Sequence, residues 1–144
     1  MADILAKRGS KSIVFTNGCF DLVHRGHVEY LSKARDLGDM LIVGLNSDNS
    51  VRRLKGATRP VSNQNSRAMV LAAFSFVDYV ILFDDDTPLN LIKTITPNIL
   101  VKGADYNRQN VVGADFVESH GGRVELIELV PGESTTNLIN KMNK

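Results

Sequence analysis

The sequence predicts an α/β fold with a doubly wound, five-stranded parallel sheet in the strand order 3-2-1-4-5. Two observations lead to this prediction. Short apolar runs typical of buried strands recur along the chain, and segments with the apolar spacing of helices separate them. The length of 144 residues suits one domain, residues 1–144, in which residues 1–10 form a flexible or helical N-terminal arm.

The strands and helices are assigned in chain order from these patterns. Strands are expected at residues 12–16, 40–45, 78–83, 98–101 and 124–129. A first helix is expected from about His27 to Gly38, because a glycine suits the C-terminal cap. Further helices are expected at residues 66–74, 88–97 and 110–120, with a final short helix that begins at Ser134.

Three boundaries carry more specific expectations. In Asp84-Asp85-Asp86-Thr87-Pro88, Thr87 is expected to cap the next helix, with Pro88 at its first position and the carboxylates near the positive end of its dipole. A metal site on these aspartates is the less favoured alternative. Gly121-Gly122 readily supplies a left-handed turn. The polar residues from Asn46 to Asn65 are expected to form a long connection, which is often functional.

The composition limits the classes of function. The chain has 17 basic and 16 acidic residues, so no overall field indicates a nucleic acid or a membrane as partner, and any anion site must be local. A single cysteine, Cys19, excludes an intramolecular disulfide and fits a reducing compartment. No apolar run approaches the roughly 18 residues of a membrane span, and the N-terminus lacks a signal-peptide core. A cytoplasmic location is therefore expected.

Three unusual segments follow strands one, four and five of the predicted sheet. They are residues 17–27, 102–106 and 131–136. In a doubly wound sheet, ligands bind beyond the carboxyl ends of the strands, beside the point where the winding reverses. With the predicted order this point lies between strands one and four. The three segments are therefore expected to meet at one crevice.

The sequence His24-Arg25-Gly26-His27 stands at a helix entrance in the first of these segments. A spacing of three residues directs both imidazoles to one side, Gly26 leaves room for a phosphate, and free amide groups there favour anions. Such donors stabilise charge that builds on a phosphate during its transfer. Taken alone, the motif is as consistent with helix capping and packing. A zinc site is less favoured, because no cysteine or carboxylate stands at ligand spacing, and no metal ligand is assigned.

The segment from Thr16 to His27 resembles the opening signature of the cytidylyltransferase-like nucleotidyltransferases, a strand followed by G-x-F-D-x-x-H-x-G-H. The resemblance implies a Rossmann-like nucleotidyltransferase fold in which His24 and His27 are catalytic and contact nucleotide phosphates. Phe20 is expected to pack in the core, and Asp21 to order the loop or, less favourably, to meet the ligand. Nucleotide contacts are further implied for Thr16, Asn17, Gly18, Cys19, Phe20 and Gly26.

Two further elements of that family are present. Ser134-Thr135-Thr136 resembles the hydroxyl-rich sequence that binds triphosphate oxygens at the start of the last helix, although Glu133 departs from the apolar residue common there. The stretch from Arg53 to Arg67, which includes Arg59, resembles the segment with a phosphate-binding lysine and a later arginine. Lys55 is accordingly assigned to the triphosphate or the acceptor phosphate as a catalytic residue. Arg67 is expected to order the loop or bind the donor.

Lys102-Gly103-Ala104-Asp105-Tyr106 resembles the V-K-G-x-D-Y element of bacterial heptose 1-phosphate adenylyltransferases, and the likeness spans nearly the whole chain. Lys102, Gly103, Asp105 and Tyr106 are therefore expected to bind the nucleotide. Gly103 would allow close approach of a ligand, and Asp105 would bind a ribose or sugar hydroxyl. The alternative is a turn acid beside an edge aromatic. The chain carries no sugar-kinase portion, so it would be the stand-alone form.

The resemblance implies transfer of AMP from ATP to D-glycero-β-D-manno-heptose 1-phosphate, which yields pyrophosphate and ADP-heptose for lipopolysaccharide core synthesis. Mg²⁺ is expected to bridge the ATP phosphates without dedicated protein ligands, and the chain to form a homodimer. Two alternatives stay open at this point. One is a CTP-dependent cytidylyltransferase of the glycerol 3-phosphate type, and the other is a catalytically inactive nucleotide-binding sensor or scaffold.

Overall fold

Five parallel strands form one sheet in the structure, a computed structural model that describes residues 2–128. The strand order is β3-β2-β1-β4-β5, which confirms the predicted fold class. Neighbouring strands pair in parallel throughout. The strands are β1 (Ile13–Gly18), β2 (Met40–Asn46), β3 (Tyr79–Phe83), β4 (Ile99–Gly103) and β5 (Arg123–Ile127).

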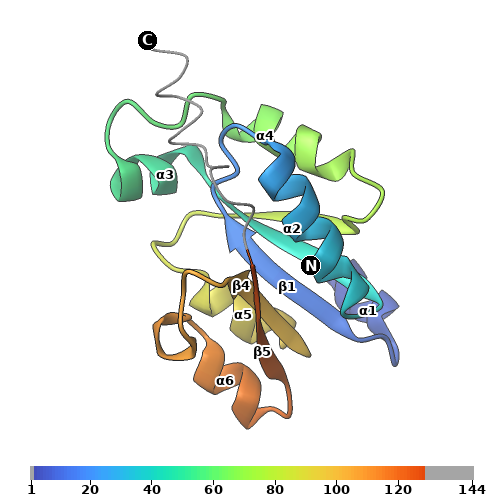
Figure 1. Cartoon of the computed structure of the whole chain (residues 1–144). Coiled ribbons are helices and arrows are strands. Elements are labelled where there is room, and N and C mark those ends of the chain that lie inside the picture. Colours follow the sequence, from blue (N-terminus) through green and yellow to red (C-terminus); the bar gives the residue numbers. More distant parts are fainter. Residues whose placement is uncertain (1, 129–144) are drawn as a thin grey trace.

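Helices cover both faces of the sheet (Figure 1). Side chains of α2 and α4 pack on one face, and side chains of α1, α5 and α6 pack on the other. Within residues 2–128, no helix is both long enough and apolar enough to cross a membrane. The helices are α1 (Ala2–Arg8), α2 (Arg25–Asp36), α3 (Asp48–Lys55), α4 (Gln64–Ala72), α5 (Leu89–Ile95) and α6 (Ala114–Ser119), with a 3-10 turn, η1 (Arg108–Asn110).

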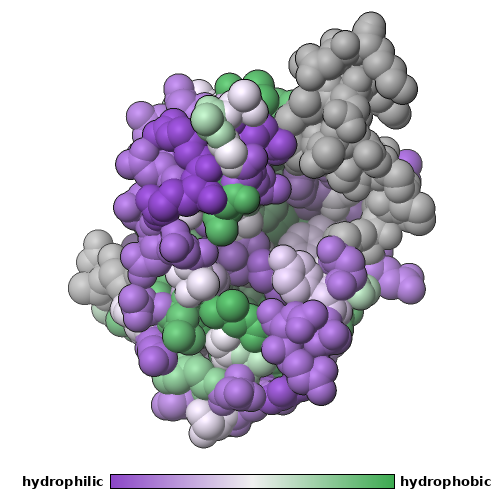
Figure 2. Space-filling model, turned by 90° about the vertical axis from the view of Figure 1, so that its left-hand side faces the viewer, coloured by the Kyte–Doolittle hydropathy of each residue, from purple (hydrophilic) through white to green (hydrophobic). Residues whose placement is uncertain are grey.

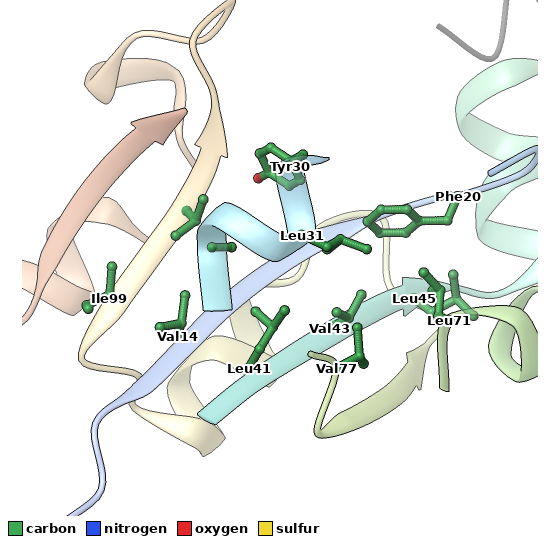
Figure 3. Packing of buried hydrophobic residues seen from close by; sticks show 12 residues of the cluster. Val14, Phe20, Tyr30, Leu31, Leu41, Val43, Leu45, Leu71, Val77 and Ile99 are labelled. Atoms are coloured by element: carbon green, nitrogen blue, oxygen red, sulfur yellow. The ribbon is translucent and has the colours of Figure 1, made fainter. Parts of the chain in front are cut away.

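The alternation of side chains along the strands creates two hydrophobic layers. On β1, Val14 points into the layer beneath α2, whereas Ile13 and Phe15 point into the layer beneath α5 and α6. Figure 3 shows the first layer, where Leu31 of α2 and Phe20 of the preceding turn lie over the strands. Each fully buried aliphatic or aromatic side chain of this kind stabilises the fold by about 1.5–3 kcal/mol. The site is thus built on a rigid base.

The prediction of a long polar connection between Asn46 and Asn65 is wrong, because this segment contains α3. The oxygen of Ser47 caps this helix by accepting from the amide of Ser50, and Asp48 occupies the favourable first turn. Val51 is its one fully buried apolar side chain, and Leu54 is exposed. The apolar periodicity that normally indicates a helix is therefore absent, and the N-cap residue Ser47 is the only sequence signal for α3.

Helix α2 begins earlier than expected, at Arg25, with His24 as the N-cap. Its C-cap is Leu37, so the prediction that Gly38 is the C-terminal cap is wrong, and Gly38 has no positive φ. A Cβ at Gly38 would lie 2.7 Å from Cγ2 of Val14. The glycine is needed because the chain passes close to β1, not because of its backbone conformation.

The acidic turn before α5 also differs from the expectation. Pro88, not Thr87, is the N-cap, and no side chain caps the helix. Instead, the Asp86 carboxylate pairs with the Arg53 guanidinium at 2.8 Å, and Asp84 accepts from the Ser47 hydroxyl. Asp84 and Asp86 thus tie this turn to the start and body of α3, while Asp85 accepts from Asn90 of α5 at 3.0 Å.

The later elements follow the expectation more closely. The residues expected as one helix at 110–120 divide into η1 and α6, because Gly113 interrupts them with a φ of +89°. The left-handed turn at Gly121-Gly122 is confirmed, with a φ of +86° at Gly121. The last residue of the strand expected at 124–129 lies outside the described residues. The helix expected to begin at Ser134 lies wholly outside them.

Candidate active site

A cavity of about 540 Å³ opens at the carboxyl ends of β1 and β4, within the volume range of small-molecule sites. The two strands pair at only two positions, Val14 with Ile99 and Phe15 with Leu100, whereas β1 and β2 pair along six. Beyond Phe15 the strands therefore leave space between their ends. Seen from the left of Figure 1, the surface is hollowed near its middle, between a mainly hydrophilic part and a part with more hydrophobic residues (Figure 2).

The two imidazoles of the H-x-G-H sequence are held in place by the start of α2. Nδ1 of His24 accepts from the amide of Gly26 at 3.1 Å, and Nδ1 of His27 accepts from the amide of His24 at 3.2 Å. The ring centroids lie 4.1 Å apart. Because each Nδ1 is an acceptor, the proton of each ring is on Nε2. The helix entrance thus fixes both the position and the tautomer of the pair.

The protonation of His27 follows from its surroundings. Burial, and to a smaller extent the charges of His24 and Lys55, lowers the pKa of His27 to about 4. At neutral pH His27 is therefore an uncharged donor, not a cation. Lys55, the last residue of α3, lies on the wall of the same cavity and supplies positive charge there. The amide groups at the start of α2 add to the attraction for an anion.

The turn between β1 and α2 is strained. Phe20 has a φ of +45°, which is unusual for a bulky residue and costs on the order of 1–3 kcal/mol. Its ring is buried and lies 5.2 Å from the ring of His27. A Cβ at Gly18 would lie 2.9 Å from this ring, so the turn requires glycine there. The ring of Phe20 both belongs to the core and forms the wall behind His27.

Asp21 orders the next loop. Its carboxylate accepts from the amides of Val61 and Ser62 and from Nε of Arg59, at 2.9–3.0 Å. Burial alone would raise the pKa of Asp21, but these two amides and the guanidinium of Arg59 together hold it below its usual value. The carboxylate is thus ionised and engaged at neutral pH. Loop ordering, the role favoured from the sequence, is what the contacts describe.

Arg67 lies behind the cavity and does not line it. It is only 1% exposed. Nη1 donates to the carbonyls of Cys19 and Asn46 at 2.7 and 2.8 Å, Nη2 donates to Asp48 at 2.8 Å, and Nε donates to the carbonyl of Ser62 at 3.0 Å. Of the two roles expected for Arg67, these contacts describe the ordering of loops rather than the binding of the donor.

Lys102 forms the other end of the cavity. Its Nζ donates to the carbonyl of Asn17 at 3.2 Å and lies 5.3 Å from the ring centre of Tyr106. Burial lowers the pKa of Lys102 to about 8, although the charges of Cys19 and Asp105 act in the opposite direction. Asp105 and Tyr106 are exposed, and Tyr106 is 41% accessible. This end offers a lysine, a carboxylate and an aromatic ring on one short segment.

Most of the predicted site residues gather at this cavity. Thr16 does not line it, because it is buried and its hydroxyl hydrogen-bonds to the Tyr30 hydroxyl at 2.8 Å. Ser134, Thr135 and Thr136 lie outside the described residues. The predicted residues on the wall are Asn17, Gly18, Cys19, Phe20, His24, Gly26, His27, Lys55, Lys102, Gly103, Asp105 and Tyr106.

Sequence reasoning missed part of the wall. Arg59 was noticed but given no role, and it lines the cavity. The turn after β3 also forms part of the wall. Its position could have been predicted, because β3, like β1, is followed by polar residues at the same edge of the sheet. The remaining missed residues are Tyr30, Asn46, Leu54, Asp86, Thr87, Pro88, Asn110 and Val112. Within residues 2–128, no three His, Cys, Asp or Glu side chains gather as a metal site.

The geometry agrees with a comparison against known families. Residues 15–140 match the family model described as cytidylyltransferase-like. The chain belongs to the cytidylyltransferase-like family. The match includes the carboxyl-terminal part of β1, the paired histidines and the wall formed by residues 102–106, which confirms the family inferred from the sequence.

Relatives within this family are similar over nearly the whole chain. It is 62% identical over 94% of its length to the bifunctional protein HldE of Syntrophotalea carbinolica, and 59% identical over its full length to that of Geobacter sulfurreducens. The chain spans only 28% and 30% of these relatives. A crystal structure of the lipopolysaccharide core biosynthesis protein from Thermoplasma volcanium aligns with a TM-score of 0.69 and 24% identity, over 83% of this chain and 97% of that one. This last likeness confirms the fold.

Proposed function

We propose that this chain transfers AMP from ATP to D-glycero-β-D-manno-heptose 1-phosphate, forming ADP-heptose for lipopolysaccharide core synthesis and releasing pyrophosphate. The observation that carries the proposal is the pair of imidazoles, each with its Nδ1 engaged by an amide, at the wall of a cavity between β1 and β4. The similarity to HldE, together with the resemblance of Lys102 to Tyr106 to heptose 1-phosphate adenylyltransferases, supports this choice of substrates.

In the proposed reaction, an oxygen of the acceptor phosphate attacks the α-phosphorus of ATP. One P–O bond forms, the bond between the α-phosphorus and its bridging oxygen breaks, and the electron pair leaves with pyrophosphate. The acceptor phosphate is already ionised at neutral pH, so no strong base is required. His24 and His27 donate from Nε2 to the oxygens of the α-phosphate as charge builds there, and Lys55 adds positive charge. The pair therefore acts by position and hydrogen bonding.

The remaining assignments complete the proposal. Ser134, Thr135 and Thr136 would bind the β- and γ-phosphates, and Asp105 with Tyr106 would bind the nucleoside. Mg²⁺, when bound to the triphosphate, would neutralise part of its charge, with phosphate oxygens as its main ligands. We also propose that the enzyme is cytoplasmic and forms a homodimer, and light scattering of the purified chain tests the homodimer.

A pyrophosphate-release assay tests the function. ATP, CTP, GTP and UTP are each combined with heptose 1-phosphate and with glycerol 3-phosphate. We expect release with ATP and heptose 1-phosphate, and a ³¹P spectrum of ADP-heptose. Release with CTP and glycerol 3-phosphate alone would favour the cytidylyltransferase alternative. Nucleotide binding without release for any pair would favour the sensor or scaffold.

A further inference from the structure

The side chain of Arg59 is fixed against the wall of the cavity by a closed set of contacts. Its Nε donates to Asp21 at 3.0 Å, and the same carboxylate accepts from the amides of Val61 and Ser62, which follow Arg59 on the loop. The Arg59 side chain is only 14% exposed and that of Asp21 only 1%. Because the loop and the guanidinium share one acceptor, Arg59 has little freedom to turn toward solvent.

One end of this guanidinium has no partner in the described part of the chain. Nη2 of Arg59 is buried and makes no hydrogen bond there. Buried donors are nearly always satisfied, so an orphaned one at a cavity wall calls for an acceptor from a ligand. The single carboxylate that Arg59 contacts is already engaged by two amides. An incoming anion would complete the hydrogen bonding of this group.

The charges of the cavity distinguish its two ends. Lys102 shares its end with Asp105, and the charge of Asp105 acts on Lys102. A lysine, a carboxylate and an aromatic ring suit a polar, uncharged ring such as a ribose. Beside the β1–α2 turn, Arg59 donates to Asp21, and the charge of Lys55 acts on His27. Both cations line the cavity, and their charges act on the thiol of Cys19, as does that of Lys102. That end suits phosphate.

We propose that the guanidinium of Arg59 binds the phosphate of the acceptor substrate. The inference rests on the proposed function, because a transfer between two phosphate-bearing substrates needs a second anion subsite beside the one formed by the histidines. A planar guanidinium offers two parallel donors to the oxygens of a terminal phosphate, which a lysine does not. The α-phosphate of ATP already has His24 and His27, and Lys55 is assigned to either the triphosphate or the acceptor phosphate, so no residue of the wall is yet dedicated to the acceptor.

Steady-state kinetics of Arg59→Lys test the proposal, with Arg52→Lys as the matched control. Arg52 is an exposed arginine on α3 whose described partner is Asn49, and it does not line the cavity. For Arg59→Lys we expect the KM of the acceptor to rise roughly 10- to 100-fold, with the KM of ATP within about threefold of wild type. Arg52→Lys should match wild type. A rise confined to the KM of ATP, or no change in either KM, would overturn the assignment.

A binding measurement separates this inference from the proposed function. Wild type and both variants are saturated with α,β-methylene ATP and titrated calorimetrically with heptose 1-phosphate, glycerol 3-phosphate and inorganic phosphate. Binding of any of the three that Arg59→Lys weakens and Arg52→Lys does not supports the subsite, even if heptose 1-phosphate is not the substrate. Equal binding by wild type and Arg59→Lys, or no binding of the three by wild type, would overturn it.

A third measurement needs no folded variant. The Nε–Hε resonance of Arg59 in wild type is assigned by elimination against the other arginines and followed during the same titrations. We expect it to shift with saturation by the phosphate monoester, while the resonance of Arg52 stays in place. A stationary Arg59 resonance at saturation would overturn the proposal, whether or not the Arg59→Lys protein folds.

Discussion

At the β1–α2 end of the cavity, each reactive side chain is held by a backbone amide, whereas at the β4 end, polar side chains project from an exposed segment. The imidazoles of His24 and His27 use Nδ1 as an acceptor of α2 amides. Asp105 and Tyr106, by contrast, are exposed. The difference teaches that the groups proposed for catalysis stand on rigid structure, and the groups proposed for substrate recognition stand on a loop. This division is common in enzymes.

The largest expected effect comes from breaking the support of the rigid end. Arg67→Met removes the donors that hold the carbonyls of Cys19 and Asn46 and leaves Asp48 without its guanidinium. We expect a loss of about 3–5 kcal/mol in the free energy of unfolding, because two buried carbonyls and a paired carboxylate lose their partner. Urea denaturation measures it. Arg123→Met, an exposed arginine on β5, is the control, and equal losses for the two variants would contradict the role of Arg67.

The second prediction concerns the catalytic pair itself. His27→Ala should lower kcat by roughly 10²- to 10³-fold, or about 2.7–4 kcal/mol in the barrier, as expected for the loss of one transition-state donor. His120 serves as the matched control, since it is an exposed histidine at the end of α6 and does not line the cavity. If His27→Ala and His120→Ala had the same turnover, the proposed mechanism would be wrong.

The third prediction follows from the pKa of His27, which burial lowers from 6.5 to about 4. Between pH 6.5 and pH 4, His27 is protonated in the unfolded chain but not in the folded protein. The free energy of unfolding therefore falls as the pH drops through this range. The full difference amounts to about 3 kcal/mol. His27→Gln should flatten this part of the stability curve relative to wild type. Parallel curves for the two proteins in urea titrations from pH 4 to 7 would refute it.

The smallest effect is expected at the loop end. Lys102 is charged at neutral pH although burial lowers its pKa to about 8, which costs folding free energy. Lys102→Met should therefore stabilise the fold by roughly 1–2 kcal/mol at pH 7 while it weakens nucleotide binding. Thermal denaturation and nucleotide titration measure the two changes. Lys93→Met on α5, at an exposed position, is the control. A destabilised Lys102→Met would show that the lysine is structural.

Sequence patterns predicted the sheet well because each strand is a short apolar run. Its order followed from general rules for doubly wound folds, and the H-x-G-H sequence located the cavity. Helix α3 was not predicted because it buries only one apolar side chain, that of Val51. The role of Arg67 as a buried support and that of Arg59 on the wall could not be separated from sequence, because both are basic residues on a polar stretch. Burial and partner choice, which depend on tertiary packing, distinguish them.

The short ladder between β1 and β4 has a consequence for how such a chain diversifies. Because the strands pair at only two positions, the opening belongs to the sheet itself and does not depend on the identity of the side chains around it. Replacement of residues along 102–106 would therefore change what fits without rebuilding the scaffold. The backbone of the two strands forms the cavity, and we expect the side chains at its edge to determine which substrate binds there.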